Sequence, residues 1–258
     1  LLAAELVGVG VAAGVLGGLL GIGGCVIMLP ALAFLFGYPL PYAIGTTITA
    51  VIITAASGAI GHIRLRNVDY STTKIIALTG AVGAAAGSVA FFYLVHQLWL
   101  LNLILGAAFL YVSIRMIYEG TVKRRMPEKR GDKVPGSAAS KSVIGFAIGV
   151  ITGIVGLGGG YALVPSFIYL LSSPVKIAVG TSLASFISMA VVSGGFKLYQ
   201  GVVNVLAAVC LGVGTAVGAQ AGARLTRVVP SWMIKAIFGF VFLYVSLRFI
   251  YQGYLCAV

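Results

Sequence analysis

The segments "GLLGIGGCVIMLPAL" at residues 18–32 and "GIVGLGGGYALVPSF" at residues 153–167 are two copies of one pattern. In each copy a run of glycines lies within apolar sequence and is followed by a proline, Pro30 or Pro165. Glycine adopts backbone conformations that other residues avoid, and proline removes a helix hydrogen bond. The pattern therefore predicts two apolar helices that are interrupted at the glycines and loosened at the prolines.

The composition surrounding these segments is that of a membrane protein. Charged residues make up 9% of the chain and hydrophobic residues 60%, whereas a soluble protein carries about 25% charged residues. Lipid leaves only helical bundles and closed β-barrels as spanning structures, because every backbone polar group must be paired internally. The apolar stretches are long and do not alternate with period two, so the sequence predicts an all-α polytopic membrane protein.

The positive charge is concentrated in one polar segment. The formal net charge is +12, and much of the excess lies in "TVKRRMPEKRGDKVPGSAASK" at residues 121–141. Cytoplasmic loops of membrane proteins are rich in lysine and arginine, so this segment is interpreted as a basic cytoplasmic linker rather than a nucleic-acid-binding region. It separates a first transmembrane repeat, residues 1–120, from a second, residues 142–258.

The two repeats are copies of each other. A shift of 135 residues maps Gly24 onto Gly159 and the Gly45-Thr46 pair onto Gly180-Thr181. Near the end of each half the shift becomes 133, and "LYVSIRMIYEG" at 110–120 matches "LYVSLRFIYQG" at 243–253 with eight identities in eleven. Duplicated halves of this kind are typical of membrane transporters.

The relative orientation of the halves depends on the glycine segment. As one helix, residues 6–36 would be about 46 Å long, well over the ~30 Å hydrocarbon core. We therefore predict a re-entrant helix pair followed by three transmembrane helices, near 42–61, 75–95 and 98–118, which makes the halves inverted repeats. This topology also gathers most basic residues on one side. The alternative, a single broken span and parallel repeats, stays open at the level of sequence.

A half-helix that starts at each glycine break would direct unpaired N–H groups and a positive dipole end into the membrane interior. Such an end is suited to an anion. The residues expected to approach the ligand are Gly23, Gly24, Gly158, Gly159 and Gly160. The alternative is close helix packing through small residues, which fits "GVGTAVGAQAG" at 212–222 better than the two breaks.

The duplicated pattern resembles that of the sulfite exporter TauE/SafE family, also called the toluene-sulfonate uptake permeases. The residues that carry the resemblance are Gly21, Gly23, Gly24 and Pro30, and Gly156, Gly158, Gly159, Gly160 and Pro165. It covers essentially the whole chain and implies a multi-pass carrier of the bacterial or archaeal inner membrane for sulfite, sulfonates or related organic anions. Cys25 stands where the second copy has Gly160, so the two breaks need not contact substrate equally.

Polar side chains inside the apolar segments are further candidates. Thr46, Thr47, Thr181 and Ser182 offer hydroxyl donors to an oxyanion, and the two pairs are expected to face each other across a pseudo-two-fold axis. The alternative is that these hydroxyls bond the backbone of their own helices. Cys25 and Tyr161, beside the two breaks, offer a thiol and a phenolic hydroxyl, although both also fit a packing role.

Two basic residues occupy equivalent positions, since His62 maps onto Lys197. We expect them near opposite membrane faces, where they would draw anions into each vestibule or, alternatively, snorkel from a helix end. The carboxylates lie at segment ends or in loops, which leaves no proton relay in the core. Any proton coupling would use His62, the substrate itself or waters. These acids are Glu5, Asp69, Glu119, Glu128 and Asp132.

The sequence therefore predicts a secondary transporter of small sulfur-containing anions, with the lipid bilayer, an anionic substrate and a proton or coupling ion as its partners. An anion channel of the same architecture is the alternative. An enzyme is not expected, because no nucleophile–base pair or metal cluster is visible. Primary active transport within this chain is not expected either, because no phosphate-binding GxxxxGK[ST] motif appears. Three cysteines without CxxC spacing indicate neither a metal site nor a disulfide framework, and no cofactor is expected.

Overall fold

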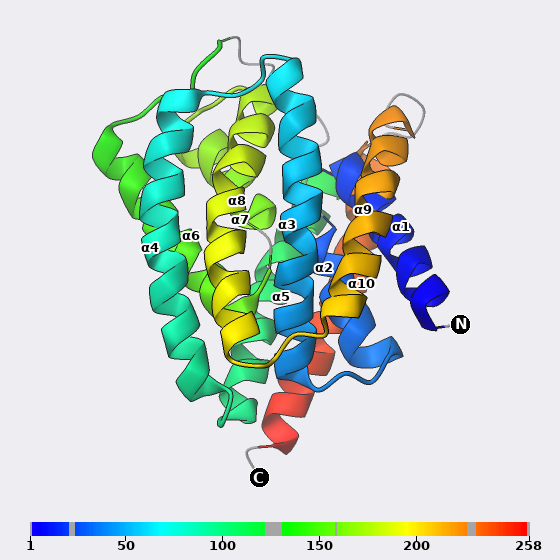
Figure 1. The fold of residues 1–258 in the computed structure, drawn as a ribbon. Coiled ribbons are helices and arrows are strands. Elements are labelled where there is room, and N and C mark those ends of the chain that lie inside the picture. Colours follow the sequence, from blue (N-terminus) through cyan, green and yellow to red (C-terminus); the bar gives the residue numbers. More distant parts are fainter. Residues whose placement is uncertain (1, 21–23, 122–130, 158, 226–230, 257–258) are drawn as a thin grey trace.

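The computed structural model describes residues 2–20, 24–121, 131–157, 159–225 and 231–256, and this part of the chain consists of helices and loops without a strand. Figure 1 shows long helices packed side by side around α3 and α8. In chain order the elements are α1 (Leu2–Leu20), α2 (Cys25–Pro30), η1 (Ala31–Leu35), α3 (Leu40–Arg64), α4 (Tyr70–Leu94), α5 (Leu98–Thr121), α6 (Ala138–Val155), α7 (Gly160–Pro165), η2 (Ser166–Leu170), α8 (Val175–Tyr199), α9 (Val205–Leu225) and α10 (Ser231–Leu255).

Six helices of the described chain are long and apolar enough to cross a membrane. They are α3, α4, α5, α6, α8 and residues Phe238–Leu255 of α10. The all-helical prediction is thus confirmed, and the two glycine segments appear as paired elements, α1 with α2 and α6 with α7.

Two helices begin earlier than predicted because of polar caps. The helix expected from residue 75 starts at Tyr70, where the Asp69 carboxylate accepts hydrogen bonds from the backbone N–H groups of Ser71 and Thr72. Likewise, α6 starts at Ala138, inside the segment interpreted as linker, and the Ser137 hydroxyl caps it. Serine, threonine and aspartate in a first turn resemble a loop by composition, yet they are good N-terminal caps.

Asp69 also ties the linker to the bundle. Its Oδ2 accepts a hydrogen bond from the backbone N–H of Val134, and the Lys141 ammonium donates to the Val134 carbonyl oxygen. Burial alone would raise the pKa of Asp69, but hydrogen bonds from Thr72, Ser71 and Val134 outweigh this effect and lower the pKa to about 2. The carboxylate is therefore ionised at neutral pH and fixes this loop.

Each proline has the same effect on the half-helix that contains it. Pro30 ends α2 and Pro165 ends α7, and five residues of π-helix follow each of them. A proline has no N–H to donate and its ring crowds the preceding turn, so the helix widens there. The two hairpins are thus loosened at equivalent positions.

Glycines allow the outer helices to pack closely across the halves. A Cβ on Gly218 would lie 2.2 Å from the Val11 carbonyl oxygen, and one on Gly87 would lie 2.1 Å from that of Val150. Helices α1 and α9 are therefore in backbone contact, as are α4 and α6. The packing role predicted for the segment 212–222 is confirmed at Gly214 and Gly218.

The contacts also fix the directions of equivalent helices. Gly58 of α3 lies against Leu183, and Gly180 of α8 lies against His62, so α3 and α8 run antiparallel. Gly106 meets Ile250 while Gly239 meets Ile117, so α5 and α10 also run antiparallel. Each pair consists of corresponding helices of the two repeats.

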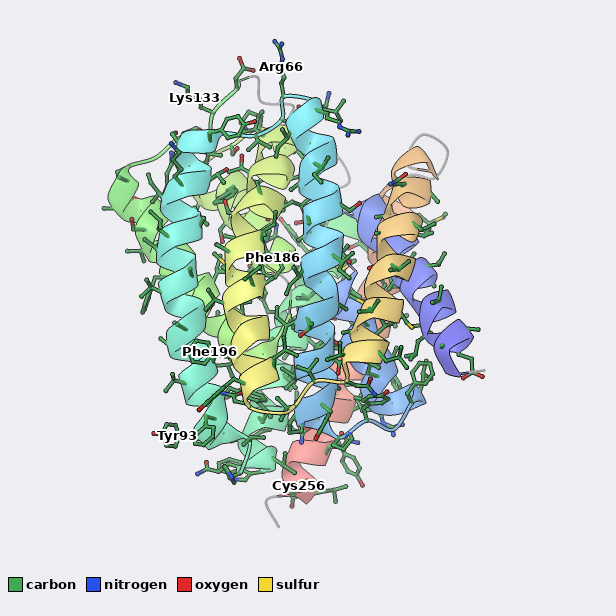
Figure 2. All side chains as sticks on the ribbon, viewed as in Figure 1. Arg66, Tyr93, Lys133, Phe186, Phe196 and Cys256 are labelled. Carbon is green, nitrogen blue, oxygen red and sulfur yellow. The ribbon has the colours of Figure 1, made fainter. Side chains whose placement is uncertain are left out.

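The second hairpin has both of its ends on one side of the bundle. Gly136, just before α6, lies against Leu171, just after η2. Figure 2 shows Lys133 and Arg66 together at this end and Tyr93 and Cys256 at the other. The chain thus enters along α6, turns at the glycines and returns along α7 and η2 to the linker end.

Candidate functional site

The second glycine break lies between α3 and α8. Gly156 ends α6 with a φ of +67°, and a Cβ there would lie 2.8 Å from the Ile44 carbonyl oxygen of α3. Gly159 precedes α7, and a Cβ on it would lie 2.5 Å from the Phe186 ring of α8. Both positions require glycine, the first for its conformation and both for space.

This geometry places the start of α7 in the middle of the bundle. Phe186 lies close to halfway along α8, as Figure 2 shows, and Gly159 is packed against it. Gly160 is the first residue of α7, and the N–H groups of a first helical turn have no partner within the helix. An interrupted helix with its N-terminal end at mid-depth is what the sequence predicted for this segment.

The first break is described from Gly24 onward. Gly24 has a φ of +71° and lies against the Ala13 carbonyl oxygen of α1, and Cys25, fully buried, begins α2. Gly23 and Gly158, both predicted as substrate ligands, lie outside the described residues, as does the side chain of Tyr161. The ligand roles of these residues stay predictions.

Thr46 and Thr181 have a structural role that the sequence did not indicate. The Thr46 hydroxyl oxygen accepts a hydrogen bond from the backbone N–H of Asn204, and that of Thr181 accepts one from Asp69, both at 3.0 Å. Asn204 and Asp69 are equivalent residues of the repeats and precede α9 and α4. Each threonine therefore holds the loop that leads into the next helix of the opposite half.

The expectation that the two hydroxyl pairs face each other is wrong. Thr181 is next to Gly180, which lies against His62 near the far end of α3. Because α3 and α8 are antiparallel, Thr46 and Thr181 lie about 24 Å apart along the bundle axis at 1.5 Å per residue. Inversion brings equivalent residues to one level only at the middle of these helices, whereas each pair lies in the first third of its own helix.

Thr47 and Ser182 are the better candidates of each pair. Both side chains are fully buried, and within the described chain neither hydroxyl has a hydrogen-bond partner. Thr47 lies three residues after Ile44, on the same helix face, and Ile44 contacts Gly156 of the second break. A buried hydroxyl without a partner costs free energy, so these groups are available to a ligand.

The two equivalent basic residues lie at opposite ends of the bundle but in different surroundings. Lys197 is fully buried, and its ammonium donates a 2.8 Å hydrogen bond to the Gly153 carbonyl oxygen in the last turn of α6. His62 is only partly buried, and its Nδ1 has no partner among the described residues. Lys197 therefore points into the protein rather than toward a membrane surface.

Sequence reasoning missed a set of polar side chains on the helices that pack at Lys197. Gln200 donates to the Ser88 carbonyl oxygen, and the Ser88 hydroxyl donates to that of Ser193. These residues come from α4 and α8, which the sequence could not place side by side. The available signal was the presence of Ser88, Ser193 and Gln200 in otherwise apolar helices.

The described residues contain no cluster of three or more His, Cys, Asp or Glu side chains that would hold a metal ion. The features present are instead two interrupted helices, buried hydroxyls and a buried ammonium, set among helices able to cross a membrane. This combination defines a class, the multi-pass membrane transporters with duplicated broken helices.

Comparison with known proteins agrees with this class. The family described as "Sulfite exporter TauE/SafE" matches residues 6–249, so the chain belongs to this family. The protein is 29% identical to the "Probable membrane transporter protein YunE" of Bacillus subtilis (strain 168), over 96% of this chain and 97% of that protein.

Other relatives carry similar names. A second Bacillus subtilis (strain 168) relative, "Probable membrane transporter protein YdhB", is 29% identical over 86% of this chain and 90% of its own. A "Probable membrane transporter protein" of Xylella fastidiosa (strain Temecula1 / ATCC 700964) is 28% identical over 92% of this chain and 90% of its own. No solved structure matches the chain. The protein is therefore a multi-pass membrane transporter of the TauE/SafE type.

Proposed function

We propose that the protein is a secondary carrier of small sulfur-containing anions, such as sulfite or sulfonates, in the cytoplasmic membrane. The observation that carries the proposal is the position of Gly159, which directly precedes α7 and lies against Phe186, about halfway along α8. The exposed N–H groups and dipole of a helix start favour negative charge, and they are most effective where water is scarce. The anion binds there, between the starts of α7 and α2.

The buried hydroxyls of Thr47 and Ser182 support this site. Both lack a partner in the described chain, and both can donate a hydrogen bond to an oxyanion without introducing a permanent charge. Gly24, Cys25, Gly159 and Gly160 line the two helix starts in this proposal, and Gly23, Gly158 and Tyr161 complete it. Thr46 and Thr181 contribute indirectly by fixing the adjacent loops.

We further propose that the halves are inverted in the membrane and that they alternate access to the site. The antiparallel directions of α3 and α8, and of α5 and α10, support this arrangement. Arg66 and Lys133 lie at one end of the bundle, which the positive-inside rule assigns to the cytoplasm. The α6–α7 hairpin then opens to the cytoplasm and the α1–α2 hairpin opens to the outside. Each glycine break thus lies between the bound anion and one face of the membrane.

The test is anion flux in proteoliposomes. The protein is reconstituted and loaded with unlabelled sulfite or taurine, and uptake of the labelled anion is followed. A carrier gives saturable uptake with transient accumulation by counterflow, whereas a channel gives neither, and repeating the assay across a pH gradient reports proton coupling. Gly159→Val is expected to reduce uptake at least about tenfold, because its side chain enters the space between the helix start and Phe186.

The matched control is Gly195→Ala, because a Cβ at Gly195 meets nothing within 4 Å. This variant is expected to transport like the wild type. Absence of uptake for every sulfur-containing anion by the wild type, or undiminished uptake by a folded Gly159→Val variant, would contradict the proposal.

A further inference from the structure

Lys197 is the centre of a buried polar cluster that the glycine breaks do not explain. Its side chain is fully buried, its Nζ lies 2.8 Å from the Gly153 carbonyl oxygen, and it also lies 3.3 Å from the centroid of the Phe91 ring. The ammonium thus joins three helices, α8, α6 and α4. A carbonyl and an aromatic face are both favourable for a cation, but neither carries a full negative charge.

The charge of Lys197 has no carboxylate partner in the described part of the chain. The ion pair found there joins Arg115 to Glu119, at the far end of α5. A buried ammonium is costly unless it is paired and hydrogen-bonded. It has three N–H donors, and the Gly153 carbonyl uses one of them. The cluster therefore has unused donors, and the protonated amine has no counter-charge among the described residues.

Two hydroxyls on the helices that Lys197 joins are further donors, since Ser193 lies one turn before it on α8 and Thr152 is next to Gly153 on α6. Ser193 accepts a hydrogen bond from Ser88, which leaves its own O–H free to donate. Thr152, which precedes Gly153, is fully buried, and within the described residues its hydroxyl has no partner. Two N–H groups and these two O–H groups match the several acceptor oxygens of a small oxyanion.

The equivalent position in the first repeat has no such cluster. His62 corresponds to Lys197, Gly58 to Ser193 and Leu65 to Gln200. The same scaffold is therefore built without these polar side chains, so the fold itself does not require them. A packing role shared by both halves would require such side chains in each half, so the difference favours a ligand-binding role.

The cluster lies between one end of the bundle and the second glycine break. Gly153 lies three residues before the break at Gly156, and Phe186, which contacts Gly159, lies about 16 Å from Lys197 along α8. Figure 2 shows Phe196, the neighbour of Lys197, at the end of the bundle opposite Arg66 and Lys133. An anion that moved along α8 between that end and α7 would pass Lys197.

We propose that Lys197, with Thr152 and Ser193, forms a second anion subsite that takes a small, singly charged oxyanion such as hydrogensulfite or an alkylsulfonate. The subsite exists in one half of the molecule only. The inference rests on the proposed function in that the anion is taken to be the transported one. When an anion binds, the ammonium provides its counter-charge and the hydroxyls orient its oxygens.

The experiment is direct binding in detergent, with taurine and sulfite as probes and chloride at matched ionic strength as the reference. Lys197→Met keeps the length of the side chain and removes the charge, and it is expected to weaken oxyanion binding at least about tenfold. Lys197→Arg is expected to bind within a few-fold of the wild type. Lys176→Met, at an exposed lysine of the same helix, is expected to bind as the wild type does.

Thr152→Val and Ser193→Ala repeat the test where the lysine variant does not fold, and each is expected to weaken oxyanion binding by about threefold to tenfold. Wild-type affinity in folded Lys197→Met, or equal affinity for chloride, would overturn the inference. The two proposals fail separately. Transport by Lys197→Met with an unchanged KM contradicts this subsite only, whereas charge-dependent binding without transport by the wild type contradicts the carrier.

Discussion

The Lys197 end of α8 and the His62 end of α3 are equivalent by duplication but differ in chemistry. At the first, a buried amine is hydrogen-bonded to the Gly153 carbonyl, and Ser88, Ser193 and Gln200 are hydrogen-bonded to one another on the adjacent helices. At the second, a partly buried imidazole has apolar or glycine residues at the corresponding positions.

Other features of the two halves are alike in detail. Thr46 bonds Asn204 as Thr181 bonds Asp69, and a π-helical segment follows both Pro30 and Pro165. Duplication has thus preserved the elements that shape the hairpins, while the polar residues at the two helix ends have diverged. We infer that the two ends of the route treat the anion differently, although the scaffold is shared.

The largest difference in stability between the two ends is expected when Lys197 and His62 are each replaced by a residue of opposite charge. In Lys197→Glu a buried carboxylate would face the Gly153 carbonyl and the negative face of the Phe91 ring, so the free energy of unfolding should fall by about 3–5 kcal/mol. His62→Glu, at a partly exposed site, should cost about 1 kcal/mol or less. Thermal melting in detergent measures both losses of stability, and equal losses would contradict the proposed difference between the Lys197 and His62 ends.

The close glycine contacts between helices, in contrast, should be equally sensitive to substitution in both halves. Gly87→Val and Gly218→Val each place a side chain against a facing backbone carbonyl, that of Val150 or Val11. Each variant is expected to lose about 1–3 kcal/mol of stability through overpacking. The melting temperatures of the two variants provide the check, with Gly61→Ala as the control because a Cβ there meets nothing within 4 Å. A large loss in one variant only would show that the halves are packed differently.

An effect of comparable size, again alike in both halves, is expected at the threonines that hold the loops. Thr46→Val and Thr181→Val each remove the acceptor of one backbone N–H, that of Asn204 or Asp69. Each should cost about 1–3 kcal/mol, nearer the lower value where water reaches the N–H. Limited proteolysis of the loops before α9 and α4, together with melting, reports the change. Unchanged protection in both variants would show that these bonds do not hold the loops.

The last effect, expected from Asp69→Asn, is distinguished by its dependence on pH; the substitution makes this loop resemble the loop at Asn204. Since folding lowers the pKa of Asp69 to about 2, the carboxylate stabilises the protein above its unfolded pKa of about 3.9. This stability is lost as the pH falls from about 4 toward 2. Melting curves of the Asn variant should depend less on pH across this window, and an unchanged dependence would contradict the role of Asp69.

The sequence was sufficient to predict the parts of the fold that depend on local pattern. The glycine runs and the prolines identified the two broken helices, and the composition identified the membrane class. Helix starts were less predictable, because the caps at Asp69 and Ser137 lie in segments that resemble loops by composition.

The candidate site was predicted less completely because it depends on contacts between distant segments. The pairing of Thr181 with Asp69, or of Lys197 with Gly153, follows from the packing of helices from opposite repeats. No local pattern gives the relative height of two antiparallel helices, which is why Thr46 and Thr181 were wrongly expected to meet. The polar residues near Lys197 were visible in the sequence but could not be assembled there.

The most direct test of the account is an experimental map of the protein with excess taurine or sulfite bound. The account predicts density for the anion at the start of α7, near the backbone of Gly159 and Gly160 and at the level of Phe186. Continuous helix from α6 into α7, or an anion bound only at the bundle surface with the interior closed by side chains, would contradict it.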